Sequence, residues 1–109
     1  MINFEKFELD NGLKVIVHQD KSTPMVAFNL LYDVGARDED PTRTGFAHLF
    51  EHLMFGGSVN IFNYDEIVEK AGGQNNAFTT NDITNYYITL PKENLEQAFR
   101  LESDRMLGL

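Results

Sequence analysis

The sequence predicts a two-layer α+β fold, in which helices pack on one face of a mainly antiparallel sheet in the order β-β-β-α-α-β-β-α. Three segments in the first third of the chain alternate between apolar and polar residues, and two later ones are rich in Thr, Tyr, Phe and Ile, as strands are. Three further segments carry the boundary signals or the apolar spacing of helices. Gly and Pro fall at the ends of these segments, so we expect one folding unit.

The first three elements are predicted to be strands. Residues 4–9 and 13–17 form a hairpin, because the Asp-Asn-Gly sequence at 10–12 tolerates the positive φ of a tight turn. Residues 25–34 form the third strand. One of its faces is almost wholly apolar and consists of Val26, Phe28, Leu30, Tyr32 and Val34.

A charged loop at residues 35–44 precedes the first predicted helix, at residues 45–55. Thr42 or Thr44 is a suitable cap for that helix, because a hydroxyl oxygen can accept a hydrogen bond from a free N–H of the first turn. We expect the acidic residues 38–40 in this loop to be solvated, and an attraction for basic peptides is the alternative.

The second half of the chain is predicted to contain two helices and a second hairpin. Residues 63–71 form a short helix that two glycines end, and residues 74–80 and 83–90 form strands around a turn. Pro91 suits the first turn of a last helix. Its apolar residues at helical spacing are Leu95, Ala98, Phe99 and Met106.

Composition and charge exclude several classes of protein. The chain has 109 residues with 42% hydrophobic and 24% charged residues, and 17 acidic against 9 basic residues give a net charge of -8. This excess of acid disfavours nucleic acid and anionic membranes as partners. The absence of cysteine removes thiolate metal sites and disulfide scaffolds. We find no signal peptide or membrane span, and we expect a soluble cytoplasmic protein, with a periplasmic or organellar full-length form as the alternative.

The first helix carries the sequence His48-Leu-Phe-Glu51-His52. With about 100° between successive helical residues, the two imidazoles and the carboxylate lie on one face. The apolar residues of the helix lie on the opposite side, which we expect to be anchored in a core. They are Phe46, Leu49, Phe50, Leu53 and Met54.

Two histidines at this spacing suit one zinc ion, because four residues of helix rise only about 6 Å. A catalytic zinc makes water acidic enough to ionise near neutral pH. Glu51 is poorly placed to share the metal with His52 and well placed to take the proton of that water, so it is the candidate general base. The alternative is that His48, Glu51 and His52 only decorate a solvated helix face.

Longer stretches around this motif resemble one family of enzymes. His-x-x-Glu-His is the signature of the inverzincins, and residues 45–57 are similar to the helix of the pitrilysin/insulysin family of zinc metallopeptidases, which includes the mitochondrial processing peptidases. Residues 72–79 and the hairpin at 9–15 also resemble family segments. Three residues match at the family's usual intervals: Asp82, Thr84 and Tyr86.

The resemblance implies zinc on His48 and His52, and Glu51 as the base that activates water for attack on a peptide carbonyl. It also implies that the strand Asn76-Ala77-Phe78 pairs with an extended peptide substrate, which satisfies main-chain groups without reading sequence. On local sequence alone, Asn76 is instead a turn or strand-end residue that bonds to its own backbone.

The family's third zinc ligand, a Glu, would fall beyond Leu109, and the chain ends on apolar residues. We therefore expect residues 1–109 to be the N-terminal part of a catalytic domain, inactive alone and completed by further domains or a homologous partner chain. A noncatalytic scaffold or partner subunit of the same fold is the alternative. A structural zinc domain would need four ligands, and the sequence offers too few.

Several other polar and aromatic residues have plainer interpretations. Glu102 lies within the apolar stripe of the last helix, where a pairing with Arg105 or a covering segment is favoured over zinc ligation. His18 is expected at the surface. Tyr86, Tyr87 and the phenylalanines are expected to fill the core or line a cleft.

Overall fold

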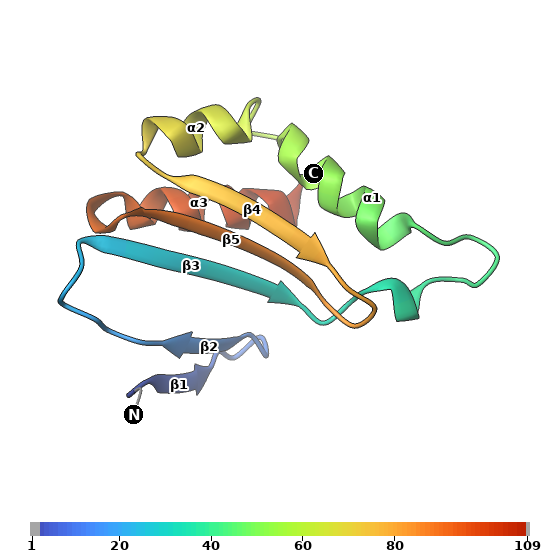
Figure 1. Cartoon of the computed structure of the whole chain (residues 1–109), viewed down its shortest axis with the longest axis horizontal. Helices are drawn as coiled ribbons and strands as arrows, with labels where there is room; N and C mark the ends of the chain where they lie inside the picture. The colour runs from blue at the N-terminus through green and yellow to red at the C-terminus, as the bar shows by residue number, and fades with distance from the viewer. Residues whose placement is uncertain (1–2, 109) are drawn as a thin grey trace.

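The order of helices and strands in the computed structural model, which describes residues 3–108, is the predicted one (Figure 1). Short 3-10 turns accompany the main elements. In chain order the elements are β1 (Glu5–Glu8), β2 (Lys14–Val17), β3 (Met25–Tyr32), η1 (Ala36–Asp38), α1 (Phe46–Leu53), η2 (Met54–Gly56), α2 (Tyr64–Lys70), β4 (Gln74–Thr79), β5 (Thr84–Pro91), η3 (Lys92–Asn94) and α3 (Leu95–Leu107).

The five strands form two antiparallel sheets. The larger has the order β3-β5-β4, with Phe28 opposite Ile88 and Ala77 opposite Tyr86. The hairpin β1-β2 forms a separate two-stranded sheet, which is drawn below β3 in Figure 1. Its turn contains Gly12 at φ 91°, as predicted from the Asp-Asn-Gly sequence.

Helices α2 and α3 cover one face of the larger sheet, as expected for an α+β fold. The alternation of β5 turns Ile88 and Leu90 toward these helices. Together with Ile61, Tyr64, Val68, Ala98 and Leu101 they form the buried core. Full burial of a side chain of this size contributes about 1.5 to 3 kcal/mol. This core holds β5 and, through the sheet, the neighbouring strand β4.

The last helix begins later than predicted, and its predicted apolar stripe is buried only in part: Ala98 lies in the core and Leu95 packs against it. Pro91 ends β5 opposite Met25, and α3 starts at Leu95 after a 3-10 turn. Phe99 and Met106 are 57% and 52% exposed, although the ring of Phe99 packs edge-on against Phe28. The buried residues are Ala98, Leu101, Glu102 and Arg105. The spacing of apolar residues does not predict this buried face, because two of its four residues, Glu102 and Arg105, are charged. Within residues 3–108, no helix has the length and apolar character required to cross a bilayer.

Candidate functional site

Helix α1 packs against β4 through the side that carries Glu51, which is 9% exposed. The prediction that its apolar side is anchored in a core is wrong for most of that side. Met54 is buried, but the other four apolar residues are about half exposed: Phe46, Leu49, Phe50 and Leu53. The reason is that α1 packs against the edge strand β4, to whose residue Thr79 the side chain of Glu51 is bonded, so the charged side of the helix faces the sheet.

The N-terminus of α1 is capped from a distance. The carboxylate of Glu39 accepts hydrogen bonds from the N–H groups of Gly45 (2.5 Å) and Ala47 (3.0 Å). A carboxylate at this position also interacts favourably with the helix dipole. The expected caps are wrong, because the hydroxyl of Thr42 donates to Asp40 and no hydroxyl caps the helix.

The two histidines of α1 converge at the solvent-exposed surface of the helix. The Nε2 atoms of His48 and His52 lie 2.8 Å apart, with 4.6 Å between the ring centroids. Two imidazole ligands of a tetrahedral zinc ion keep their nitrogens about 3.3 Å apart. The pair therefore fits a zinc ion after a small movement of the rings. Among residues 3–108, no third His, Cys, Asp or Glu joins them to form a cluster that could hold a metal.

The carboxylate of Glu51 is held by a residue that sequence reasoning missed. The Oγ1 of Thr79 donates a hydrogen bond to Oε2 of Glu51. Thr79 is the last residue of β4 and follows Glu51 by 28 positions. No local pattern could have revealed this contact, because it depends on how α1 lies against the sheet.

The predicted substrate strand is an edge of the sheet in the described part of the chain. Ala77 pairs with Tyr86, on the inner side of β4. Phe78 is 43% exposed on the other face, where its ring lies 6.5 Å from that of Tyr87. The Oδ1 of Asn76 accepts a hydrogen bond from the N–H of Ala77 (2.8 Å), which is the backbone contact expected from the local sequence.

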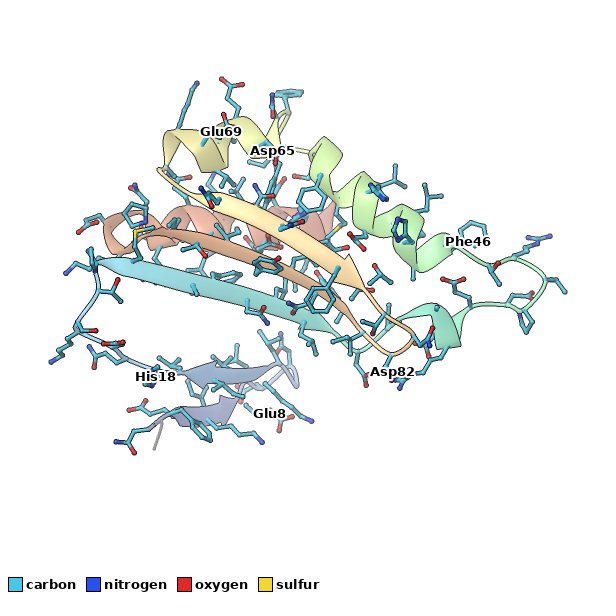
Figure 2. The ribbon with its side chains drawn as sticks, viewed as in Figure 1. Glu8, His18, Phe46, Asp65, Glu69 and Asp82 are labelled. Atoms are coloured by element: carbon cyan, nitrogen blue, oxygen red, sulfur yellow. The ribbon has the colours of Figure 1, made fainter. Side chains whose placement is uncertain are left out.

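A cavity of about 580 Å³ adjoins the candidate site between α1, α2 and β4. Glu51, His52 and Asn76 line one part of it, so the candidate base, a candidate ligand and the strand edge face the same space. Asp65 and Glu69 of α2 line another part, and Figure 2 shows both on that helix above the sheet. A chain bound along β4 would meet the candidate base from this space.

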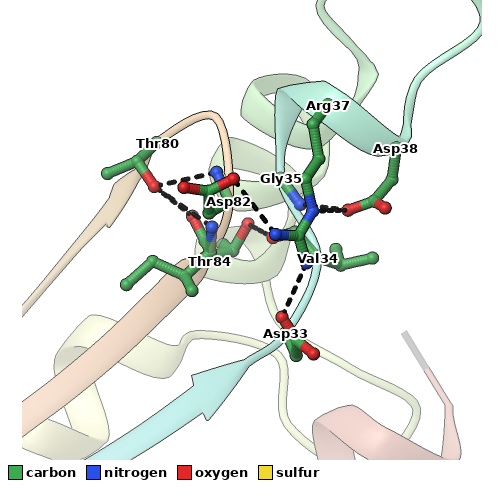
Figure 3. Close-up of polar contacts among 9 residues, drawn as sticks. Asp33, Val34, Gly35, Arg37, Asp38, Thr80, Asp82 and Thr84 are labelled. Atoms are coloured by element: carbon green, nitrogen blue, oxygen red, sulfur yellow. Dashed lines mark hydrogen bonds and ion pairs between the residues drawn. The ribbon is translucent and has the colours of Figure 1, made fainter.

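The turn between β4 and β5 is fastened to the segment after β3. The guanidinium of Arg37 contacts Asp33 (2.9 Å), Asp82 (3.1 Å) and Asp38 (3.6 Å), as Figure 3 shows. The N–H groups of Ala36 and Arg37 donate to the carbonyls of Thr80 and Asn81. Asp38 and Asp40 are exposed, as expected, and residues 38–40 also accept hydrogen bonds from backbone N–H groups of the loop and of helix α1.

The family model for insulinase, peptidase family M16, matches residues 14–107. This chain belongs to the insulinase family of peptidases. The recognition of the pitrilysin/insulysin family from the sequence is therefore confirmed.

Relatives in the insulinase family carry the same segment within much longer chains. The zinc protease PqqE of Helicobacter pylori is 37% identical over 96% of this chain and 24% of its own length. The human insulin-degrading enzyme is 32% identical over 87% of this chain and 10% of its own. A protease from Helicobacter pylori superposes with a TM-score of 0.94 at 35% identity, covering 99% of this chain and 27% of that one. The crystal structure of pitrilysin superposes with a TM-score of 0.84 at 26% identity, and the match covers 95% of this chain and 11% of pitrilysin.

The chain thus spans about a quarter or less of the insulinase-family relatives it matches. Members of this family act on peptides, and names such as zinc protease agree with zinc as the family's metal. The predicted fold class is also confirmed, because the structural match covers nearly every described residue.

Outside the candidate site, a charged pair is buried within residues 3–108. Glu102 and Arg105 form a salt bridge with side chains 4% and 1% exposed, as the sequence favoured. Tyr64 donates to Glu102 (2.5 Å), and Arg105 donates to the carbonyl of Met54 (2.8 Å). Burial and the Glu102 carboxylate raise the pKa of the Tyr64 phenol well above its ordinary value. The cluster links α3 to the C-terminal end of α1.

Two further residues were correctly assigned to structural positions. Tyr86 is buried beneath Arg105, whose guanidinium lies 4.9 Å from its ring centroid, and burial raises the pKa of Tyr86 to about 12. His18 is exposed near the N-terminus (Figure 2), and its Nδ1 contacts the carbonyl of Asn3 at 2.6 Å. Neither residue belongs to the candidate site.

Proposed function

We propose that the full-length protein containing this chain is a zinc-dependent metalloendopeptidase, which hydrolyses peptide bonds with a metal-activated water. One observation carries the proposal: two imidazole nitrogens converge 2.8 Å apart on α1 next to a buried carboxylate. The same helix turn supplies two ligands and a base, which is the arrangement that metal-assisted hydrolysis requires.

His48 and His52 would hold the zinc through Nε2. When bound, zinc acts as a Lewis acid that lets a water ionise near neutral pH and polarises a peptide carbonyl. Glu51 accepts the proton of the attacking water on a carboxylate oxygen and then delivers a proton to the departing amine. Its burial against β4 keeps bulk water away from one side of the carboxylate, so the base faces the cavity.

The edge of β4 is proposed to bind the substrate. An extended peptide that adds to Asn76, Ala77 and Phe78 would satisfy main-chain donors and acceptors without reading side chains. The Oδ1 of Asn76 now accepts from the N–H of Ala77, and rotation of this amide would free both groups for a substrate. Broad specificity follows from this mode of binding.

Two ligands are too few for a catalytic zinc, which takes three protein ligands and an open position. We propose that the third ligand and the rest of the substrate chamber come from further domains of the protein or a homologous partner chain. The 109-residue chain alone is then expected to bind zinc weakly and to be inactive. This expectation agrees with the fourfold greater length of the zinc protease relative.

The test is hydrolysis of unstructured peptides by the full-length protein before and after chelation. Glu51→Gln should abolish turnover while zinc content persists, because the amide cannot accept the proton. Glu66→Gln is the matched control, since Glu66 is an exposed glutamate paired with Lys70 on α2. Retained turnover in Glu51→Gln would refute the base. Absence of both zinc and turnover in the wild type would favour a noncatalytic subunit.

A further inference from the structure

We propose that Thr79 is a positioning residue that fixes the carboxylate of Glu51 for proton transfer. This inference rests on the proposed function, because it gives a role to a residue beside the proposed base. Its foundation is the hydrogen bond from Oγ1 of Thr79 to Oε2 of Glu51. Among residues 3–108, no other hydrogen bond to the Glu51 side chain is formed.

The hydrogen bond between Thr79 and Glu51 can run in only one direction. An ionised carboxylate can only accept, so the hydroxyl of Thr79 must donate to it. Oε1 accepts no hydrogen bond within residues 3–108, so it is the oxygen that is more open to accept a proton from water. A buried glutamate without this partner would have several rotamers available, and only some of them would present an oxygen to the cavity.

Thr79 is itself rigidly held. Its branched Cβ restricts χ1, and its backbone pairs with Thr84 at the end of the sheet. The turn that follows is closed by the N–H of Thr80 donating to the carbonyl of Ile83 (2.8 Å). The same turn accepts hydrogen bonds from the N–H groups of Ala36 (3.1 Å) and Arg37 (2.8 Å).

One short segment therefore supports both partners of the contact. Residues 35–37 hold the turn that follows Thr79, while Glu39 caps the helix that carries Glu51. Both attachments come from residues 35–39, so one segment restrains the end of β4 and the start of α1, in addition to the direct packing of α1 against β4. This arrangement is what a positioning contact requires, and a chance surface contact would lack it.

The test compares Thr79→Val with Thr79→Ser in the full-length protein. Valine keeps the branched shape and removes the hydroxyl, whereas serine keeps the hydroxyl. We expect valine to lower kcat about 10- to 100-fold, the range found for partners that orient a metal site, with KM and zinc content unchanged. Serine should restore most of the lost kcat. Thr89→Val is the matched control, because Thr89 is an exposed threonine of the neighbouring strand β5.

A readout that does not depend on activity separates this proposal from the proposed function. Crystal structures of the metal-free proteins should show Glu51 in one rotamer in the wild type and Thr79→Ser, and in a different or multiple rotamers in Thr79→Val. An unchanged Glu51 rotamer, a wild-type kcat in the valine variant, or a serine variant no better than valine would overturn it. A wild type without peptidase activity would defeat the proposed function, and the rotamer comparison would still decide the role of Thr79.

Discussion

The Nε2 atoms of His48 and His52 lie 2.8 Å apart, which is hydrogen-bond distance. Without a metal, one of the two nitrogens donates its N–H and the other accepts, whereas both would direct lone pairs at a bound zinc ion. The i, i+4 spacing on α1 permits this approach, and the exposure of both rings leaves the site open to an incoming ion.

Loss of one histidine should release the metal. Loss of a residue that only hydrogen-bonds to a metal ligand weakens metal binding about 10- to 100-fold. We expect a larger loss of zinc affinity in His52→Ala, because this change removes a direct ligand. Metal titration of the full-length protein would measure this. His18→Ala is the control, since His18 lies exposed near the N-terminus and bonds to Asn3. Equal weakening by both variants would contradict a specific site.

Gly35 should tolerate no side chain. A Cβ there would lie 2.5 Å from the carbonyl oxygen of Thr80 and 2.7 Å from backbone atoms of Asn81. Gly35→Ala must push the β4-β5 turn away and should destabilise the protein by about 1 to 3 kcal/mol. Gly56→Ala has nothing within 4 Å of its added Cβ and is the control. Urea unfolding measures both, and equal midpoints would disprove the close approach.

The buried pair of Glu102 and Arg105 should behave as a unit. Removal of one partner leaves an uncompensated buried charge, so Glu102→Leu or Arg105→Met should each cost about 3 to 5 kcal/mol. The double variant should cost less than the sum of the two, because no charge is stranded. Denaturant unfolding of the four proteins gives the cycle. Strict additivity would show that the two side chains do not interact.

Asp104 should make stability depend on pH in acid. A hydrogen bond from the Ser58 hydroxyl, and to a lesser extent one from the Asn60 side chain, lowers the pKa of Asp104 in the folded protein. Its contribution is therefore fully present above the unfolded pKa, about 4, and is lost as the pH falls through the lower folded pKa. The urea midpoint of the wild type should exceed that of Asp104→Asn at pH 6.

This difference in midpoint should shrink steadily below pH 4. Asp10→Asn serves as the control, because Asp10 lies in the exposed β1-β2 turn. A difference between wild type and Asp104→Asn that stays constant down to strongly acidic pH would show that the ionised form of Asp104 is not what its neighbours stabilise.

The features that could be predicted from the sequence are those that depend on a few consecutive residues. Strand alternation, the Asp-Asn-Gly turn and the i, i+4 histidines each involve a few consecutive residues, and the structure contains all of them. The orientation of α1 was wrong, because an apolar stripe normally faces a core, and here the helix contacts an edge strand through Glu51.

The residues that support the candidate site could not be found this way. Thr79 meets Glu51 across 28 positions, and Arg37 meets Asp82 across 45. Glu39 had a usable signal, since an acid shortly before a helix is favoured by the helix dipole. Its distance of six residues from Gly45 lies outside the ordinary capping patterns, in which Thr42 and Thr44 are the nearer candidates.

The cap by Glu39 has a practical consequence for protein engineering. The side chain of Glu39 bonds directly to the N–H groups of Gly45 and Ala47, so the two ends of the surface loop 40–44 are held together. This contact does not depend on how many residues the loop contains. Each doubling of a flexible loop costs only about 0.6 kcal/mol in closure entropy. An epitope tag or a fluorescent label inserted between Pro41 and Arg43 would therefore report on the protein without moving the histidine helix.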